Sequence, residues 1–236
     1  MPSGDIRTAG DITRLIAGQP QMMDILSAVS SLNLQDCWVG AGFVRNAVWD
    51  AIQGLPRQPH CGDGDVDVVH FDRSNLCPEC DLAIEARLAV SLPGVPWQVR
   101  NQARMHLRNG DMPYADTADA IRHWPETCTA VAVRSDRGRL RLLAPLGISD
   151  LVSMTVTPTP AFADKDDVFR ARVAEKQWTR RWPDVRITGG ASVGARLPGG
   201  ERRTCDSVGD CAEEGKLLSL FHPCRKQGHA PARTDP

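Results

Sequence analysis

The residues best suited to chemistry are two carboxylates separated by one position, in the run Asp65-Val66-Asp67-Val68. If this run forms a strand, alternation places Asp65 and Asp67 on one face, with their Cα atoms roughly 6.5 Å apart. Two carboxylates at this spacing can bind one divalent cation, or contribute to a two-metal site about 3.5–4 Å across. Their hard oxygen atoms favour Mg²⁺ or Mn²⁺ over zinc.

A second element suited to chemistry precedes the carboxylates. Trp38 and Val39 are followed by Gly40 and Gly42, and an amphipathic pattern with helical spacing begins at Phe43. Glycine lets a backbone approach an anion closely, and the free N–H groups at a helix N-terminus attract one. An isolated Asp-x-Asp pair is more often a solvated surface pair. The glycine turn upstream favours a bound triphosphate instead, with its cations held by the aspartates.

The elements that would position these groups follow from hydrophobic periodicity and turn residues. Strands are expected at 37–39, 65–71 and 97–99, followed by a hairpin of 127–134 and 139–143. Helices are expected at 22–34, 43–52, 82–92, 117–124 and 166–182.

The bulk composition is that of a soluble protein. The chain has 236 residues, a formal net charge of −1 and 8 cysteines. Residues 1–14 carry charges and lack the apolar core of a signal peptide. No run approaches the roughly 18–20 apolar residues of a membrane helix. We therefore expect a cytoplasmic protein with free thiols and no membrane partner. A polyanion would have to bind a local basic patch.

The stretch from Val39 to Asn46, followed by Asp65 to Val68, resembles the nucleotidyltransferase-fold signature. That signature is a hydrophobic residue, a glycine turn, a helix, and then a carboxylate–hydrophobic–carboxylate strand. The resemblance implies an α/β (α+β) nucleotidyltransferase (polymerase-beta-like) fold, in which helices flank a mixed sheet. It also implies metal-dependent transfer of a nucleoside monophosphate from an NTP to an acceptor. Asn46 replaces an aspartate of the similar tRNA nucleotidyltransferases, so tRNA is not predicted as the acceptor.

Further segments resemble a bacterial family of nucleotidyltransferase-like proteins, once catalogued only as a domain of unknown function and sometimes labelled nitrate reductase. The family implies the fold and the metal site, but no substrate. We expect its domain to cover 1–187. Residues 188–236 are rich in Gly, Pro, Arg, Asp and Ser, and we expect a disordered tail there. The matching segments are Trp38–Asp50, Asp65–Asp72, Asn101–His106, Trp124–Val131 and Pro145–Leu151.

The resemblance implies a role for each candidate residue. Asp65 and Asp67 are the expected catalytic and metal-binding residues, with Mg²⁺ or Mn²⁺ as the cofactor. Gly40 and Gly42 are expected to bind the phosphates of the nucleotide. Arg104 lies in a short polar segment and is suited to bidentate phosphate contact; a polar loop bonded to its own backbone is the alternative.

Three questions stay open at this point. A third carboxylate is expected on a strand beside the aspartates, where Gln98 is neutral, and Glu126 is the other candidate. Without a third carboxylate, the alternative is an inactive module that binds a nucleotide or a partner. The basic C-terminal helix, which contains Trp178 and Trp182, permits binding to nucleic acid, although a solvated face is the commoner reason for such a pattern. Arg45 is expected on a helix face that is either exposed or directly behind the site, in an ion pair, with phosphate binding as the alternative.

Overall fold

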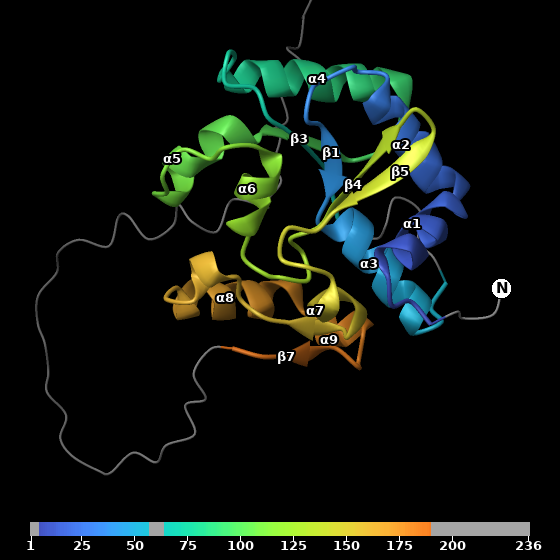
Figure 1. Cartoon of the computed structure of the whole chain (residues 1–236), viewed down its shortest axis with the longest axis vertical. Helices are drawn as coiled ribbons and strands as arrows, with labels where there is room; N and C mark the ends of the chain where they lie inside the picture. The colour runs from blue at the N-terminus through green and yellow to red at the C-terminus, as the bar shows by residue number, and fades with distance from the viewer. Residues whose placement is uncertain (1–4, 57–63, 190–236) are drawn as a thin grey trace, which may run out of the picture. The chain divides into compact units, whose positions relative to one another are not determined.

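The computed structural model describes residues 5–56 and 64–189. A five-stranded mixed sheet has the order β3-β2-β1-β4-β5 (Figure 1). β2 and β3 are parallel, β1 is antiparallel to both β2 and β4, and β4 is antiparallel to β5. The expected mixed sheet is confirmed. Its strands are β1 (Trp38–Gly40), β2 (Val66–His70), β3 (Trp97–Asn101), β4 (Ala132–Asp136) and β5 (Arg139–Leu143).

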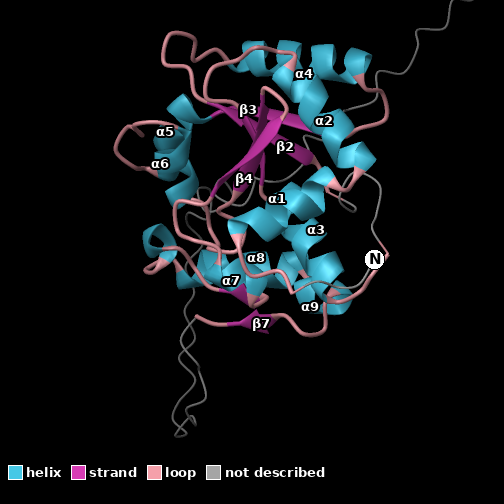
Figure 2. Cartoon of the chain, turned by 45° about the vertical axis from the view of Figure 1, so that its right-hand side comes forward, coloured by secondary structure: helices cyan, strands magenta, loops and turns pink. Residues whose placement is uncertain are grey.

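Helices flank the sheet, as expected for an α/β protein. Figures 1 and 2 show α4 on one side of the strands, and α8, α9 and β7 on the other. A small parallel sheet of β6 (Thr155–Val156) and β7 (Arg186–Ile187) accompanies the C-terminal helices. The helices are α1 (Ala9–Ala17), α2 (Pro20–Ser30), α3 (Gly42–Ile52), α4 (Pro78–Ser91), α5 (Met105–Asn109), α6 (Thr117–Arg122), α7 (Ser149–Val152), α8 (Asp166–Lys176) and α9 (Trp178–Arg181), with 3₁₀ turns η2 (Gln102–Arg104) and η3 (Pro160–Phe162).

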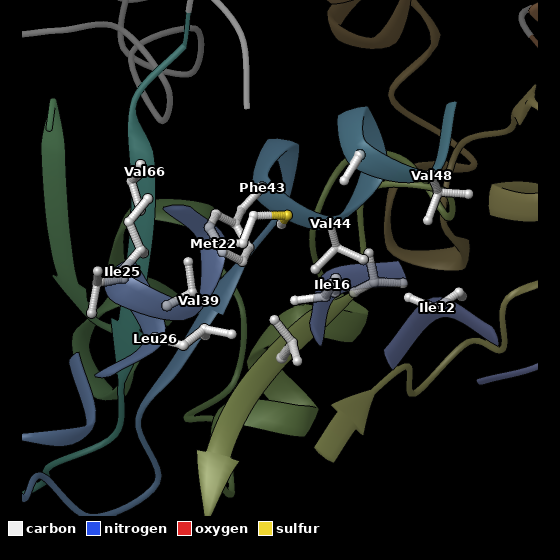
Figure 3. Close-up of a cluster of buried hydrophobic side chains, with 14 of the residues drawn as sticks. Ile12, Ile16, Met22, Ile25, Leu26, Val39, Phe43, Val44, Val48 and Val66 are labelled. Carbon is white, nitrogen blue, oxygen red and sulfur yellow. The ribbon is translucent and has the colours of Figure 1, made fainter. Parts of the chain in front are cut away.

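Alternation along β2 separates the core from the site. Val66 and Val68 are buried in the main hydrophobic core, whereas Asp67 between them faces away from it. Burial of the apolar faces of α1, α2 and α3 against the sheet supplies the main favourable contribution to folding. Figure 3 shows these side chains around β1 and β2, among them Ile12, Ile16, Met22, Ile25, Leu26, Val39, Phe43, Val44 and Val48.

The helix α3 is fastened to the C-terminal helices. The ring of Trp49 packs edge-on against those of Trp178 and Trp182, with centroids 6.4 and 5.2 Å apart. The carboxylate of Asp50 accepts hydrogen bonds from Arg181 Nη2 at 2.9 Å and from Trp182 Nε1 at 2.9 Å. The segment around α9 therefore fixes the helix that begins at the glycine turn.

The prediction of one helix over 166–182 is wrong. The chain forms α8 and α9, separated by Gln177, whose φ of 46° is left-handed. A residue in this conformation ends a helix, because the next amide can no longer reach the carbonyl one turn back. As a result, α9 does not continue α8, and its Trp178 packs against Trp49 of α3.

The predicted strand 127–134 also starts too early. β4 begins at Ala132, and the preceding residues form a turn in which Thr129 and Ala130 donate their amides to the Glu126 carbonyl at 3.1 and 3.0 Å. The helix α1 was not predicted, although a capping box of Thr8 and Asp11 starts it.

The disordered tail and the absence of a membrane partner stay predictions. The disordered tail expected at 188–236 lies, beyond Gly189, outside the described residues. Among the helices that are described, none is long and apolar enough to cross a membrane.

Candidate active site

The two aspartates and the glycine turn meet at one edge of the sheet. Asp65 directly precedes β2, and Asp67 is the second residue of this strand. Val39 pairs with Val68, so the antiparallel register places Gly40, the last residue of β1, opposite Asp67. Two motifs that are separate in the sequence are therefore neighbours in the structure.

Gly40 is needed for packing at this edge. A Cβ atom on Gly40 would lie 2.8 Å from Cη2 of Trp124 and 3.1 Å from the carbonyl oxygen of Val131. Both distances are shorter than ordinary van der Waals contacts, and the second atom belongs to the backbone. A side chain here would push β1 away from the neighbouring turn. Gly40 therefore allows the end of β1 to pack closely against Trp124 and Val131, whether or not a phosphate binds beside it.

The turn after Gly40 directs the start of α3. Ala41 has a backbone φ of 51°, which residues other than glycine rarely adopt. Its amide donates to the Val131 carbonyl at 2.9 Å. Among the described residues, no side chain caps α3, and its first turn contains no acidic residue. The N–H groups at this end, beginning with Gly42, suit an anion.

The aspartates are poorly stabilised as a pair of anions. Burial raises the pKa of Asp67 to about 7, and the charge of Asp65 raises it further, against the opposing effects of Arg172, Arg45 and Lys176. Burial also raises the pKa of Asp65, opposed mainly by Lys176. Asp67 therefore titrates near neutral pH when no metal is bound, and a divalent cation would displace its proton.

Arg45 is buried, which excludes the exposed one of the two faces expected for it. Its guanidinium Cζ lies 5.4 Å from the ring centroid of Trp49 and 5.2 Å from that of Trp178. Its Nη1 donates to Thr129 Oγ1 at 2.9 Å, and its Nη2 donates to Asn46 Oδ1 at 2.8 Å. Because α9 covers α3, these rings and hydrogen bonds take the place of solvent around the cation.

A second buried cation, Arg172 of α8, lies near the aspartates. It forms an ion pair with Glu126 through Nε, and the two side chains are 8% and 0% exposed. The other carboxylate oxygen of Glu126, Oε2, is buried and has no hydrogen-bond partner among the described residues. Glu126, one candidate for the third carboxylate, is thus paired with an arginine of the C-terminal part of the chain.

The strands beside β2 present no carboxylate next to Asp67. On one side Gln98 of β3 pairs with Asp67 in register and is buried. On the other side lies Gly40. No group of three or more His, Cys, Asp or Glu side chains in the described ranges is placed to hold a metal ion. The aspartates alone are the carboxylate ligands that the described site offers.

Arg104 lies away from the aspartates, beyond the end of β3 at the opposite edge of the sheet. Its Nη2 forms an ion pair with Asp81, which also contacts His70 Nε2 at 3.1 Å and accepts the Asn101 amide at 3.0 Å. One nitrogen, Nη1, is buried without a partner among the described residues. The structure brings Asp67 and the glycine turn together and leaves Arg104 out, so its phosphate-binding role stays a prediction.

The cations Arg172 and Lys176 were not singled out as site residues in the sequence. From the sequence, the basic residues of this helix suggested either a solvated face or a surface for nucleic acid. A signal was available: both residues follow Phe169 at helical spacing, so they lie on its buried side.

Comparison with known proteins gives one family and several related folds. Residues 27–187 match a family model described as a nucleotidyltransferase. A search of curated proteins gives no match. The chain is similar to an NMR structure described as revealing a CCA-adding enzyme head domain, with a TM-score of 0.70 and 29% identity over 79% of this chain and 99% of that one.

Two more solved structures align less closely. One is the Thermotoga maritima CCA-adding enzyme complexed with tRNA, with 17% identity and a TM-score of 0.47. The other is a CCA-adding enzyme in complex with ATP, with 16% identity and a TM-score of 0.45. Each alignment covers 75% of this chain and 42% of the other.

The similarity to the head domain confirms the predicted fold, since it extends over the five-stranded sheet and its helices. The family model spans the glycine turn, both aspartates and α8. The chain therefore belongs to this nucleotidyltransferase family.

Proposed function

We propose that the protein transfers a nucleoside monophosphate from an NTP to a hydroxyl acceptor, using Asp65 and Asp67 as metal ligands. The observation that carries the proposal is the register that sets Gly40 opposite Asp67, beside the uncapped start of α3. An anion-binding element and a cation-binding pair are thereby adjacent, as a metal–triphosphate complex requires.

The donor set fits Mg²⁺ or Mn²⁺. Two carboxylates share one face, and burial raises the pKa of both in spite of the cations around them. Mg²⁺ in nucleotide sites is commonly held by one or two protein carboxylates, with water and phosphate oxygens completing its octahedron. When bound, such cations would neutralise the negative charge that develops on the phosphates.

The described residues supply binding and orientation. Gly40 and Gly42 let the backbone approach the β- and γ-phosphates, and the N-terminal amides of α3 donate to them. The acceptor oxygen forms a bond to the α-phosphorus as the bond from that phosphorus to the α,β-bridging oxygen breaks. Pyrophosphate leaves with the electron pair, and the acceptor hydroxyl loses its proton as the ester forms. Arg45, held between two tryptophan rings, offsets the charge of Asp67 from within the fold.

A pyrophosphate-release assay tests the proposal directly. The full chain is incubated with Mg²⁺ or Mn²⁺, each of the four NTPs, and a panel of acceptors that includes RNA ends, protein hydroxyls and small alcohols. Release should depend on metal and acceptor, and Asp67→Asn should reduce it by about a thousandfold, since several kcal/mol of transition-state stabilisation is lost.

Asp24→Asn is the matched control, because Asp24 is an exposed carboxylate on α2. It should release pyrophosphate at the rate of the unaltered protein. If calorimetry detects no NTP binding to the unaltered protein and none to Asp65→Ala, the proposal is wrong.

A second function is favoured by one observation. Gln98 stands where a third carboxylate would, and Glu126 is paired with Arg172. These observations favour an inactive module that binds a nucleotide or a partner. Such a module would bind NTP and metal without releasing pyrophosphate. A turnover that Asp67→Asn abolishes would exclude this alternative.

The acceptor and Arg104 need separate arms of the same assay. RNA is included because the head-domain structure to which this chain is similar is described as that of a CCA-adding enzyme. Arg104→Gln tests the predicted phosphate contact: weaker NTP binding at unchanged thermal stability would support it. A fall in stability with unchanged NTP binding would assign Arg104 to the Asp81 ion pair alone.

A further inference from the structure

One face of α8 carries two cations beside the aspartates. Phe169, Arg172 and Lys176 share this face by their helical spacing, and the first two are buried. Against the larger effect of burial, Arg172 and Lys176 both lower the pKa of Asp67. The contacts place Arg172 beside the glycine turn, because its partner Glu126 begins the turn that packs there. In that turn Thr129 Oγ1 accepts a hydrogen bond from Arg45 Nη1 at 2.9 Å, and the Val131 carbonyl accepts the Ala41 amide at 2.9 Å.

Glu126 holds the nearer of these cations in place. Its carboxylate pairs with Arg172 Nε, and neither side chain is exposed to solvent beyond 8%. The backbone of this segment is fixed as well, because the Thr127 amide donates to the Thr157 carbonyl at 3.0 Å and the Ala130 amide donates to the Glu126 carbonyl at 3.0 Å. A guanidinium bound at Nε by a rigid carboxylate has its plane defined.

A buried ion pair of this kind is a poor source of stability. Removing two charges from water costs about as much as their attraction returns, so apolar residues would serve the fold equally well. The pair is more readily explained by the direction it gives to Arg172. Lys176 differs, since it is 28% exposed and contacts Glu175 at 3.4 Å. It is an accessible cation on the same face.

We propose that Arg172 and Lys176 bind the β- and γ-phosphates of the nucleotide, with Glu126 as a positioning residue for Arg172. This inference rests on the proposed nucleotidyl transfer and names the residues that recognise its leaving group. Phosphate oxygens suit the planar guanidinium, which donates two parallel hydrogen bonds, and the ammonium, which acts as a compact charge. The diphosphate part of the nucleotide, and not the base or sugar, would therefore be recognised by α8.

Calorimetric titration of the full chain with ATP, AMP and inorganic pyrophosphate, each with Mg²⁺, tests the proposal. Lys176→Gln should weaken ATP and pyrophosphate binding about tenfold or more, because one charge-assisted contact is lost, and leave AMP binding unchanged. Arg170→Gln is the control on the same helix, where an exposed arginine pairs with Asp166 at 3.5 Å. It should change none of the three affinities.

The buried pair needs a design that leaves no isolated charge, since Arg172→Gln alone strands Glu126. In the double variant Glu126→Gln with Arg172→Gln, two neutral amides replace the ions. This variant should lose affinity for ATP and pyrophosphate but not for AMP. If Glu126 acts only through Arg172, Glu126→Gln should weaken ATP binding in the unaltered background and have no further effect once Arg172 is glutamine.

The outcomes separate the two proposals. Selective loss of ATP and pyrophosphate affinity supports the role of α8. Unchanged ratios of ATP to AMP affinity in Lys176→Gln and in the double variant overturn it, while ATP binding by the unaltered protein leaves the proposed function standing. Absence of ATP binding by the unaltered protein overturns the proposed function itself.

Discussion

Two carboxylates at opposite ends of β2, the half-buried Asp67 and the buried Asp81 of α4, are in opposite electrostatic situations. At its beginning, burial raises the pKa of Asp67 to about 7, and Asp65 adds repulsion. Beyond its end, burial also raises the pKa of Asp81, but hydrogen bonds from His70, Arg104 and the Asn101 amide outweigh that effect and lower it. The surrounding residues therefore favour the ionised form of Asp81 and disfavour that of Asp67.

This difference distinguishes a carboxylate that stabilises the fold, Asp81, from one suited to binding a cation, Asp67. A carboxylate whose donors are all supplied by the protein stabilises the fold, whereas one that lacks them is destabilising until a ligand arrives. Asp81 fastens the first turn of α4 to the ends of β2 and β3. Asp67 lies near the start of β2, where Arg172, Arg45 and Lys176 offset only part of the effect of burial on its charge.

The largest effect is expected at Asp81. Asp81→Asn leaves the buried Arg104 guanidinium without its carboxylate, and should lower the free energy of unfolding by about 3–5 kcal/mol. Urea unfolding at pH 7 measures it, with Asp24→Asn as a control that changes stability by less than about 0.5 kcal/mol. The folded pKa of Asp81 is lowered, so its stabilisation holds above its unfolded pKa and is lost as pH falls through the folded value. A loss below about 1 kcal/mol would remove the contrast between the two ends.

The opposite sign is expected at Asp67. The folded pKa of Asp67 is raised from 3.8 to about 7, so ionisation disfavours the fold as pH rises between these values. Asp67→Asn should therefore stabilise the metal-free protein by about 2–4 kcal/mol at pH 8 and by almost nothing at pH 4. Thermal unfolding in chelator at both pH values measures the gain. Equal effects at pH 4 and pH 8 would contradict the raised pKa.

The glycine turn refines the description of the end of β2 that carries Asp67. Gly40→Ala should cost about 1–3 kcal/mol, because the new methyl group would meet the Trp124 ring and the Val131 carbonyl. Gly42→Ala should change stability by less than about 1 kcal/mol, since its Cβ meets Arg45 and Asn46 only at 3.6 Å. Urea unfolding of the two variants compares them. Similar losses would mean that packing does not distinguish the two glycines.

The smallest effect concerns protons and metal. Because a cation must displace a proton from the aspartate pair, Mn²⁺ affinity should fall by about tenfold for each pH unit below about 7 and level off above it. Calorimetry between pH 5.5 and 8.5 measures the slope. An affinity that does not depend on pH would show that both aspartates are ionised without metal.

The local part of the site could be predicted from the sequence, because its signals are short in range. Alternation places Asp65 and Asp67 on one face, and the glycines mark the turn before α3. Their proximity could be anticipated only through the family resemblance, since it depends on the register of β1 against β2. The position of Gln98 opposite Asp67 followed from the same assumption and is confirmed.

The rest depends on contacts between distant segments. The sequence left open whether Arg45 is exposed, because nothing in its own helix shows that Trp178 will cover it. Glu126 was a candidate third carboxylate, and its pairing with Arg172 could not be predicted without knowing where α8 packs. The break at Gln177 carries no glycine or proline to announce it. In each case the controlling interaction is tertiary, and local propensity does not contain it.

The unusual backbone of Ala41 has a consequence for the rate at which a nucleotide is captured. Its amide is committed to Val131, and its carbonyl accepts the amides of Val44 and Arg45 at 3.2 and 3.0 Å. A turn held from both sides cannot reorient when a ligand arrives, so the entropy cost of aligning the helix dipoles is met once, during folding. Preorganisation of this kind would leave docking of the triphosphate limited by encounter and by water release, with no rearrangement of the loop.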